Sequence, residues 1–247
     1  MRAYVCFDDT DMLDCGRGTG KLGRWMLERL PAGCTGWGVV RQQLLVHPDI
    51  PMTSHNSAAC AVIDVPDADV VPELISIAIA LIEEEFIEGS DPGLCVATEA
   101  DIDALIELQA FGQLAAVVVT TKAVAREAAA GIHLSEHGGT GGGIIGAAAG
   151  VGLTANGWAG RLIEYRVPLR GFARESRVRD IEAAGIRVLA IDRNVGVPAP
   201  DDIVDTHDWL RPRLWGHEPA VPVLWDGDGR WNAVATRPGE ETFGTTS

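Results

Sequence analysis

The chain has 247 residues, with 20 lysines and arginines against 35 aspartates and glutamates, and a formal net charge of −15. Apolar residues make up 47% and charged residues 22%, values that are typical of globular proteins and exclude a disordered chain. The acidic balance disfavours binding to phosphate backbones and anionic membranes, because no stretch of the sequence forms a basic patch.

Strands and helices alternate along the first half of the chain. An apolar strand at residues 2–7 leads into a glycine-rich loop and then a helix at 21–30, in which Leu22, Trp25 and Met26 share one face. The same kind of spacing predicts strands at 36–45, 57–65 and 94–96, and helices at 72–88, 100–110 and 122–130. Residues 117–120 favour a further short strand.

The second half is less regular. Residues 138–150 are mostly glycine and alanine, and strands expected at 161–167 and 187–192 flank a helix at 180–185. From Thr206 onward four tryptophans stand among prolines, which is typical of irregular strands. The alternation of strands and helices indicates an α+β or α/β fold class.

Cysteine usage and the N-terminus bear on the cellular compartment. The five cysteines are scattered without a C-x-x-C pair, which favours a reducing compartment over a disulfide framework or a zinc ribbon. Asp8 follows the N-terminus too soon for a signal-peptide apolar region, and the uncharged run at 74–82 is too short to cross a bilayer. We expect a cytoplasmic protein with no membrane partner.

An acidic motif follows the first strand. Asp8, Asp9 and Asp11 lie within four residues, and such a turn is best tolerated where a cation balances the mutual repulsion. Carboxylate oxygens suit Mg²⁺, which usually takes one or two of them together with phosphate oxygens. The alternative is an Asp-rich turn that caps the following helix.

A first glycine loop contains Gly16, Gly18, Gly20 and Lys21 and lies between this motif and the next helix. Backbone amides in such a loop can bind phosphate, with help from the helix N-terminus. The spacing is not that of a P-loop, because Leu22 occupies the Ser/Thr position. The alternative is a plain flexible connection.

A second glycine run includes Gly139, Thr140 and Gly141-x-Gly143-x-x-Gly146, a literal match to the dinucleotide-binding fingerprint. That fingerprint needs a strand directly before it, and residues 131–137 are too polar for a central strand. An NAD-dependent dehydrogenase is therefore a minor alternative. A loop whose amides, including that of Gly142, meet an anion is the preferred interpretation.

His133, Glu136 and His137 match the H-x-x-E-H pattern of inverted zinc proteases. Zinc would need both histidines on one face of a stable helix, and Gly138-Gly139 would end such a helix at once. The sequence also lacks a G-x-S-x-G elbow for serine nucleophile chemistry.

Taken together, these motifs resemble the archaeal 2-agmatinylcytidine synthetases that modify isoleucine tRNA. The resemblance extends over residues 1–230, because its anchors occur in the family's order. The anchors are the strand and Asp8-Asp9-Thr10-Asp11, the segment His47-Pro48-Asp49-Ile50-Pro51, Asn56-Ser57-Ala58, the turn Asp91-Pro92-Gly93, the run Gly141 to Ala149, the strand Leu162 to Arg166, and Asp208-Trp209 with Pro222 to Trp225.

The resemblance implies an α+β fold with a kinase-like catalytic domain at 1–160, a ferredoxin-like domain at 161–235 and a flexible tail at 236–247. It implies ATP and Mg²⁺ as cofactors, with Asp8, Asp9 and Asp11 holding the metal and the phosphates. The family phosphorylates a threonine of its own after the acidic motif, for which Thr19 is the candidate here. The segment Gly141 to Gly146, together with Asn56, would contact the nucleotide or the activated oxygen.

The family activates a cytidine carbonyl oxygen by phosphorylation, and the amine of agmatine then displaces it. Here the sequence has no counterpart of the family's OB-fold and zinc ribbon, and His55 stands where the family has an Arg-Gly pair. We therefore expect this chemistry on a small-molecule or nucleobase-like substrate with a cationic amine. The alternatives are tRNA modification with a separate tRNA-binding chain, and an inactive nucleotide-binding protein. A homo-oligomer is left open.

Overall fold

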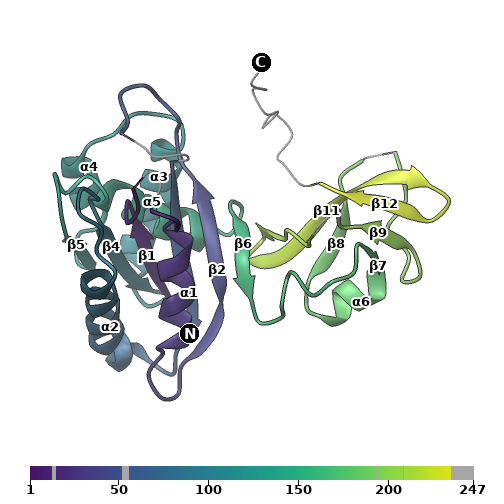
Figure 1. Cartoon of the computed structure of the whole chain (residues 1–247), viewed down its shortest axis with the longest axis horizontal. Coiled ribbons are helices and arrows are strands. Elements are labelled where there is room, and N and C mark those ends of the chain that lie inside the picture. The colour runs from purple at the N-terminus through teal and green to yellow at the C-terminus, as the bar shows by residue number, and fades with distance from the viewer. Residues whose placement is uncertain (13–14, 52–55, 193, 208, 235–247) are drawn as a thin grey trace. The chain divides into compact units, whose positions relative to one another are not determined.

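The computed structural model describes residues 1–12, 15–51, 56–192, 194–207 and 209–234 (Figure 1). The chain divides into two units, Met1–Arg166 with Leu214–His217, and Val167–Arg213 with Glu218–Ser247. Both contain strands and helices, so the predicted α+β class is confirmed. The flexible tail predicted at 236–247 and the position of His55 lie outside the described residues. No helix among the described residues is long and apolar enough to cross a membrane.

The first unit is built on a sheet with the strand order β5-β4-β1-β3-β2-β6-β10. Neighbouring strands from β5 to β6 all run antiparallel. The strands are β1 (Arg2–Asp8), β2 (Thr35–Gln43), β3 (Ser57–Asp64), β4 (Gly93–Thr98), β5 (His133–Glu136), β6 (Arg161–Tyr165) and β10 (Arg213–Trp215). Strand β1 is therefore an interior strand of this sheet, with β4 and β3 as its neighbours.

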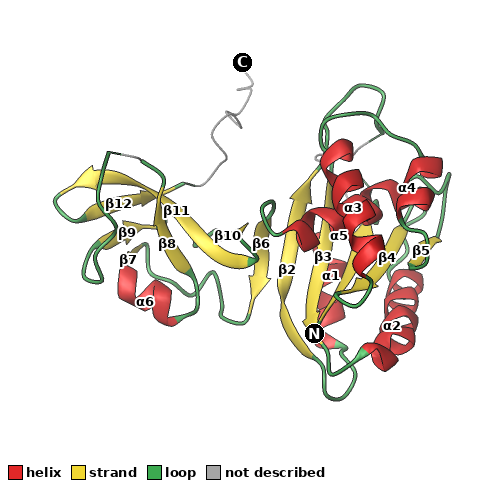
Figure 2. Ribbon diagram, turned by 180° about the vertical axis from the view of Figure 1, so that it is seen from behind, coloured by secondary structure: helices red, strands yellow, loops and turns green. Residues whose placement is uncertain are grey.

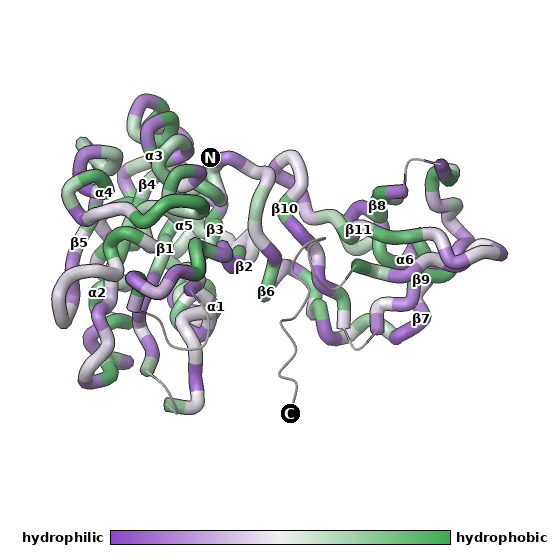
Figure 3. The backbone as a smooth tube through the Cα atoms, turned by 90° about the horizontal axis from the view of Figure 1, so that it is seen from above, coloured by the Kyte–Doolittle hydropathy of each residue, from purple (hydrophilic) through white to green (hydrophobic). Residues whose placement is uncertain are grey.

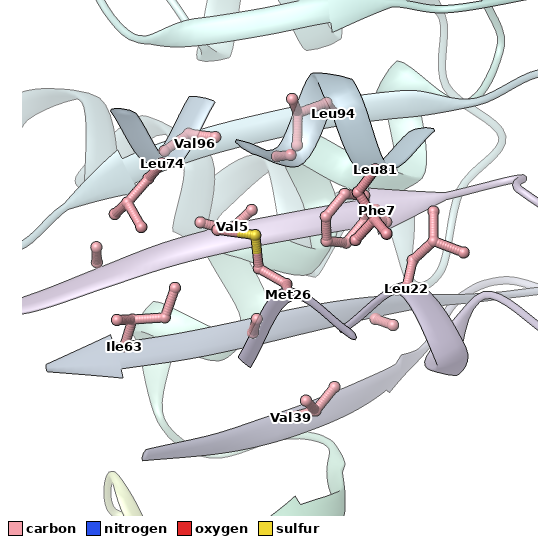
Figure 4. Close-up of a cluster of buried hydrophobic side chains, with 14 of the residues drawn as sticks. Val5, Phe7, Leu22, Met26, Val39, Ile63, Leu74, Leu81, Leu94 and Val96 are labelled. Atoms are coloured by element: carbon pink, nitrogen blue, oxygen red, sulfur yellow. The ribbon is translucent and has the colours of Figure 1, made fainter. Parts of the chain in front are cut away.

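Helices α1 (Gly20–Glu28) and α2 (Val71–Glu84) cover one face of this sheet, and a short 3₁₀ turn at Ala68–Val70 precedes α2. The core between them is a cluster of buried aliphatic side chains and Phe7 (Figure 4). Because side chains alternate along a strand, Val5 and Phe7 point into this core, while Cys6 and Asp8 point to the opposite face.

The opposite face is covered by α5 (Ile144–Asn156), which contacts β1, β3 and β4. Helix α5 is rich in alanine and glycine and almost entirely buried, and it is mostly green in the hydropathy view (Figure 3). Helix α3 (Ile102–Ala115) packs on its outer side, and α4 (Lys122–Ala128) contacts both helices. Small residues let α5 lie close to the sheet and to α3 at the same time.

The second unit contains a mixed sheet with the order β8-β11-β12-β9-β7 and the helix α6 (Val178–Ala183) (Figure 2). The strands are β7 (Glu175–Arg177), β8 (Arg187–Ala190), β9 (Ile203–Asp205), β11 (Glu218–Gly227) and β12 (Arg230–Ala233). Strands β11 and β12 form an antiparallel hairpin, and β8 and β9 flank it in parallel. The tryptophan-rich tail thus supplies the centre of a sheet, with Trp231 buried.

Two expectations differ from the structure. Strand β6 lies in the first unit, although the boundary expected at 160/161 puts it in the second, because it pairs with β2. Residues 117–120 form no strand and follow the end of α3 as a turn. Residues 133–136 form a strand, β5, but at the edge of the sheet with one neighbour and partly exposed side chains, which agrees with the expectation that they are too polar for a central strand.

Candidate functional site

A cavity of about 420 Å³ lies in the first unit, at the carboxyl end of β1. Six separate stretches of the chain line it: the acidic motif, Thr19 before α1, the β2–β3 loop, the segment before β4, the end of α3 with the residues after it, and the second glycine run. The lining residues are Asp8, Asp9, Asp11, Thr19, Leu44, Asp49, Ile50, Pro51, Asn56, Ser57, Gly89, Asp91, Ala115, Val118, Val119, Thr120, Gly139, Thr140, Gly142, Gly143, Ile145 and Gly146. The cavity therefore joins the acidic motif to the second glycine run, which are more than a hundred residues apart in sequence.

Asp8 and Asp9 form the acidic floor of this cavity. Burial, followed by the charge of Asp9, raises the pKa of Asp8 to about 8. Burial, followed by the charges of Asp91 and Asp11, raises the pKa of Asp9 to about 6. Carboxylates that are both buried and close together favour either a proton or a bound cation.

The donor set is suited to Mg²⁺ in combination with phosphate oxygens. Among the described residues, no three His, Cys, Asp or Glu side chains converge to hold a metal ion, so Asp8, Asp9 and Asp11 do not form a complete cage. Mg²⁺ commonly takes one or two carboxylates and completes its octahedron with phosphate oxygens and water. The hard oxygen donors and the crowding of charge fit that mode of binding.

Thr19 lies beside Asp11 at the wall of the cavity. The buried Thr19 hydroxyl donates a hydrogen bond of 3.1 Å to Asp11 Oδ1. This threonine precedes the first residue of α1, so its backbone position is fixed by the start of that helix. An oxygen nucleophile and a proton acceptor are thereby brought together.

The second glycine run is held by a residue that the sequence analysis treated only as part of a turn. The carboxylate of Asp91 accepts hydrogen bonds from the backbone N–H of Thr140 (3.1 Å), Gly141 (2.6 Å) and Gly142 (2.9 Å), and from the Thr140 hydroxyl (2.6 Å). Burial favours a higher pKa for Asp91, but these hydrogen bonds outweigh it and lower the pKa. The loop amides do meet an anion, and that anion belongs to the chain itself.

The remaining glycines of this run are required by close packing. A Cβ atom on Gly143 would lie 2.2 Å from the carbonyl oxygen of Asp91, and one on Gly146 would lie 1.7 Å from Asp8 Oδ2. Gly93 is equally restricted, because its Cβ would lie 2.1 Å from the backbone of Gly143. The spacing that matches a dinucleotide fingerprint thus reflects the approach of α5 to β1 and β4.

From the first glycine loop, only Thr19 lines the cavity. Gly16, Gly18, Gly20 and Lys21 are absent from its lining, although Gly18 lies close to Asp11. The Lys21 ammonium instead lies 5.7 Å from the centre of the Trp25 ring. The phosphate-binding role expected for these four residues therefore has no support from the cavity.

Asn56 lines the cavity and also shapes the β2–β3 loop, because its side-chain amide donates a 2.6 Å hydrogen bond to the carbonyl of Leu45. The apolar wall was not predicted from the sequence. Val118 and Val119 are 48% and 43% exposed and line the cavity together with Ile50 and Pro51. These valines are exposed because the chain leaves α3 without forming a strand. Their β-branched side chains had favoured a buried strand instead.

The two histidines of the H-x-x-E-H match are not on a helix. His133 and His137 each lie within hydrogen-bond distance of the Ser135 hydroxyl, at 2.8 and 2.7 Å, while Glu136 pairs with Arg126. Burial lowers the pKa of both histidines. The zinc-protease geometry is therefore absent, and β5 is an antiparallel edge strand rather than the parallel strand of a dinucleotide-binding unit.

Comparisons with solved structures place this fold beside tRNA-modifying enzymes. The chain is similar to apo TiaS, the tRNAIle2 agmatidine synthetase, with 28% identity and a TM-score of 0.50 over 62% of this chain and 35% of that chain. It is similar to TiaS in complex with tRNAIle2 and ATP, with 26% identity and a TM-score of 0.52 over 74% and 43%. A tRNA fluorescent labeling enzyme gives 27% identity and a TM-score of 0.53 over 73% and 42%.

These similarities confirm the resemblance that the sequence motifs indicated. The chain spans about two fifths of the length of the solved structures that it matches. No protein-family model and no curated protein matches it.

Proposed function

We propose, from the fold shared with an agmatidine synthetase, that this chain binds ATP with Mg²⁺ and activates a carbonyl oxygen by phosphorylation for displacement by an amine. The observation that carries the proposal is the cavity in which Asp8, Asp9, Asp11 and Thr19 meet the second glycine run. One of the structures with this fold is a complex with ATP. Activity and substrate belong to the proposal, because the chain spans only part of those proteins.

The charge of the cavity supports a metal-bound nucleotide over a free one. No lysine, arginine or histidine stands among the described residues that line it, whereas five aspartates do. A bare triphosphate would be repelled by these carboxylates. In this proposal Asp8 and Asp9 hold Mg²⁺, which when bound neutralises phosphate charge and orients the γ-phosphoryl group.

Thr19 is the proposed phosphoryl acceptor of the chain. Its hydroxyl oxygen attacks the γ-phosphorus, the bond to the ADP leaving oxygen breaks, and the proton passes to Asp11 Oδ1, which already accepts the Thr19 hydrogen bond. The Thr19→Ala variant should take up no phosphate on incubation with Mg-ATP. Thr19→Ser keeps the hydroxyl and should be phosphorylated, and the intact mass of each protein measures the outcome.

The substrate carbonyl is proposed to belong to a small molecule or a nucleobase-like ring. The apolar wall of Val118, Val119 and Ile50 suits a flat ring, and the exposed carboxylate of Asp49 suits the cationic end of an amine. Phosphorylation converts the carbonyl oxygen into a good leaving group, and attack by the amine releases it as phosphate.

Nucleotide turnover by the purified chain with Mg-ATP, with and without agmatine and simple amines, tests the proposal. We expect ADP or AMP to form, with loss of turnover in Asp8→Asn and full turnover in the control Asp103→Asn, an exposed carboxylate outside the cavity. Turnover that survives in Asp8→Asn would refute the metal role. Binding of ATP without turnover would favour the inactive nucleotide-binding alternative.

A second candidate is modification of a tRNA cytidine with a tRNA-binding part supplied by another chain. The observation that favours it is that similar structures include complexes with tRNAIle2. A gel-shift experiment with tRNA at low salt tests it, because phosphate contacts are strongest there. No retardation at low salt, by the chain alone or with candidate partner chains, would leave the small-molecule substrate.

A further inference from the structure

The carboxylate of Asp91 occupies a site that is built for an anion. Three successive backbone N–H groups, those of Thr140, Gly141 and Gly142, and the Thr140 hydroxyl all donate to its two oxygens. Successive amides that converge in this way form an anion-binding nest of the kind that cradles phosphate in other proteins. In this chain the carboxylate of Asp91 itself occupies the nest.

Asp91 also contacts the acidic motif. The backbone N–H of Asp91 donates a 3.1 Å hydrogen bond to the carbonyl of Asp9. Gly143 packs directly against the carbonyl oxygen of Asp91. A single residue thus ties the acidic motif to the second glycine run, on the two sides of the same cavity. Removing its side chain would release the loop without removing the backbone link to Asp9.

We propose that Asp91 is a positioning residue that closes the nest at Thr140–Gly142 to phosphate, so that a nucleotide is held only through a divalent cation at Asp8 and Asp9. This inference rests on the proposed function. A phosphate group entering the nest would have to expel a carboxylate with four hydrogen bonds, in a cavity where the described lining residues supply no positive side chain. The glycine run then sets the shape of the cavity rather than its affinity for phosphate.

Binding of inorganic pyrophosphate and of ATP, measured by calorimetry in excess EDTA, tests the inference. The wild-type chain should bind both only at or below the detection limit without metal. Asp91→Ala should bind metal-free pyrophosphate at least about tenfold more tightly than the wild type, because three amides and a hydroxyl become available. Asp91→Asn keeps one acceptor oxygen and should give a smaller gain.

Asp49→Asn is the matched control, because it also removes one negative charge from the cavity lining, while the amides of Thr140, Gly141 and Gly142 donate to Asp91 instead. If Asp49→Asn gains metal-free pyrophosphate binding equally, general charge and not the nest is responsible, and the inference is wrong. It is also wrong if wild-type ATP affinity is the same in EDTA as in Mg²⁺.

Failure of the proposed function gives a different result. A wild-type chain that binds no ATP even with Mg²⁺ would refute nucleotide binding. Pyrophosphate binding by Asp91→Ala would still show that the Asp91 carboxylate keeps phosphate out of the nest. Circular dichroism of both Asp91 variants checks their folding. If Asp91→Ala unfolds, Asp91→Asn decides the outcome on its own: no gain over Asp49→Asn overturns the inference.

Discussion

Asp8 ends β1 with its carboxylate against Gly146 of α5, where a larger residue would not fit. Burial destabilises the charged form of this carboxylate. Its position depends on the absence of a Cβ atom on Gly146. Both can be changed separately, which allows the electrostatic and steric contributions to the site to be distinguished.

Gly146→Ala should damage the site more than the fold. Its Cβ would lie 1.7 Å from Asp8 Oδ2, the movable end of a side chain, so the carboxylate must shift away from its place in the cavity. We expect weaker Mg²⁺-dependent ATP binding with a loss of stability of only about 1 kcal/mol. Gly18→Ala is the control, because its Cβ would make an ordinary contact of 3.7 Å with Asp11. Equal effects of the two variants on binding would contradict this account.

The stability of the chain should depend on pH and on Mg²⁺ together. The pKa values of Asp8 and Asp9, about 8 and about 6, lie above the value of about 3.9 in an unfolded chain. The folded chain therefore binds more protons, and the free energy of unfolding falls as pH rises through the window from about 4 to about 8. Thermal unfolding in EDTA should show a falling Tm over this range, and excess Mg²⁺ should reduce the fall.

Asp8→Asn should lose the larger part of this pH dependence, because the amide does not titrate. A wild-type Tm that changes with pH identically in EDTA and in Mg²⁺ would argue against a cation at these carboxylates.

At the scale of elements, α5 is packed between the sheet and α3. On one side Gly150 allows it to approach Cys6 of β1, and on the other Gly152 packs against the carbonyl of Leu108 in α3. Glycine lowers helix propensity by about 1 kcal/mol per residue relative to alanine, so this helix depends on its packing. Its small side chains let the sheet on one side and α3 on the other lie close to the helix axis.

Gly152→Ala should be strongly destabilising. A Cβ there would lie 1.8 Å from the carbonyl oxygen of Leu108, which is backbone in a helix and cannot rotate away. We expect a loss of about 3 kcal/mol or more in chemical unfolding, despite the better helix propensity of alanine. Gly196→Ala, where nothing lies within 4 Å, should change stability by less than about 0.5 kcal/mol. Equal stability of the two variants would mean that α3 and α5 do not pack as closely as described.

Local patterns were sufficient to predict most elements of the first unit, because buried strands and amphipathic helices have short periods. The acidic motif was recognised for the same reason, since Asp8, Asp9 and Asp11 are adjacent in sequence. The role of Asp91 could not be predicted, because its partners lie 49 to 51 residues away and only the fold brings them together. The first glycine loop shows the converse, because the fold brings Thr19 to the cavity but none of the glycines that form the local pattern.

For the whole molecule, the five cysteines are all unpaired, as expected from their spacing. Cys6 on β1 lies directly opposite both Cys60 on β3 and Cys95 on β4, and all three are fully buried, while Cys15 and Cys34 are partly accessible. Burial raises the pKa of both Cys6 and Cys95, which further suppresses their reactivity.

Titration with an aromatic disulfide reagent should therefore modify only Cys15 and Cys34 in the native protein. The three sheet thiols should react together, at the rate at which the first unit unfolds. Rapid native modification of Cys6 would contradict the packing of α5 over β1.

The position of α5 between the sheet and α3 has a consequence for the order in which the first unit assembles and opens. A helix with low intrinsic propensity that needs contacts on both sides gains little until β1, β4 and α3 are already in place. Its amide hydrogens should then exchange with solvent only when the whole unit opens, whereas those of the edge strand β5 should exchange through local fraying. The most glycine-rich helix of the chain would thus be among its best protected.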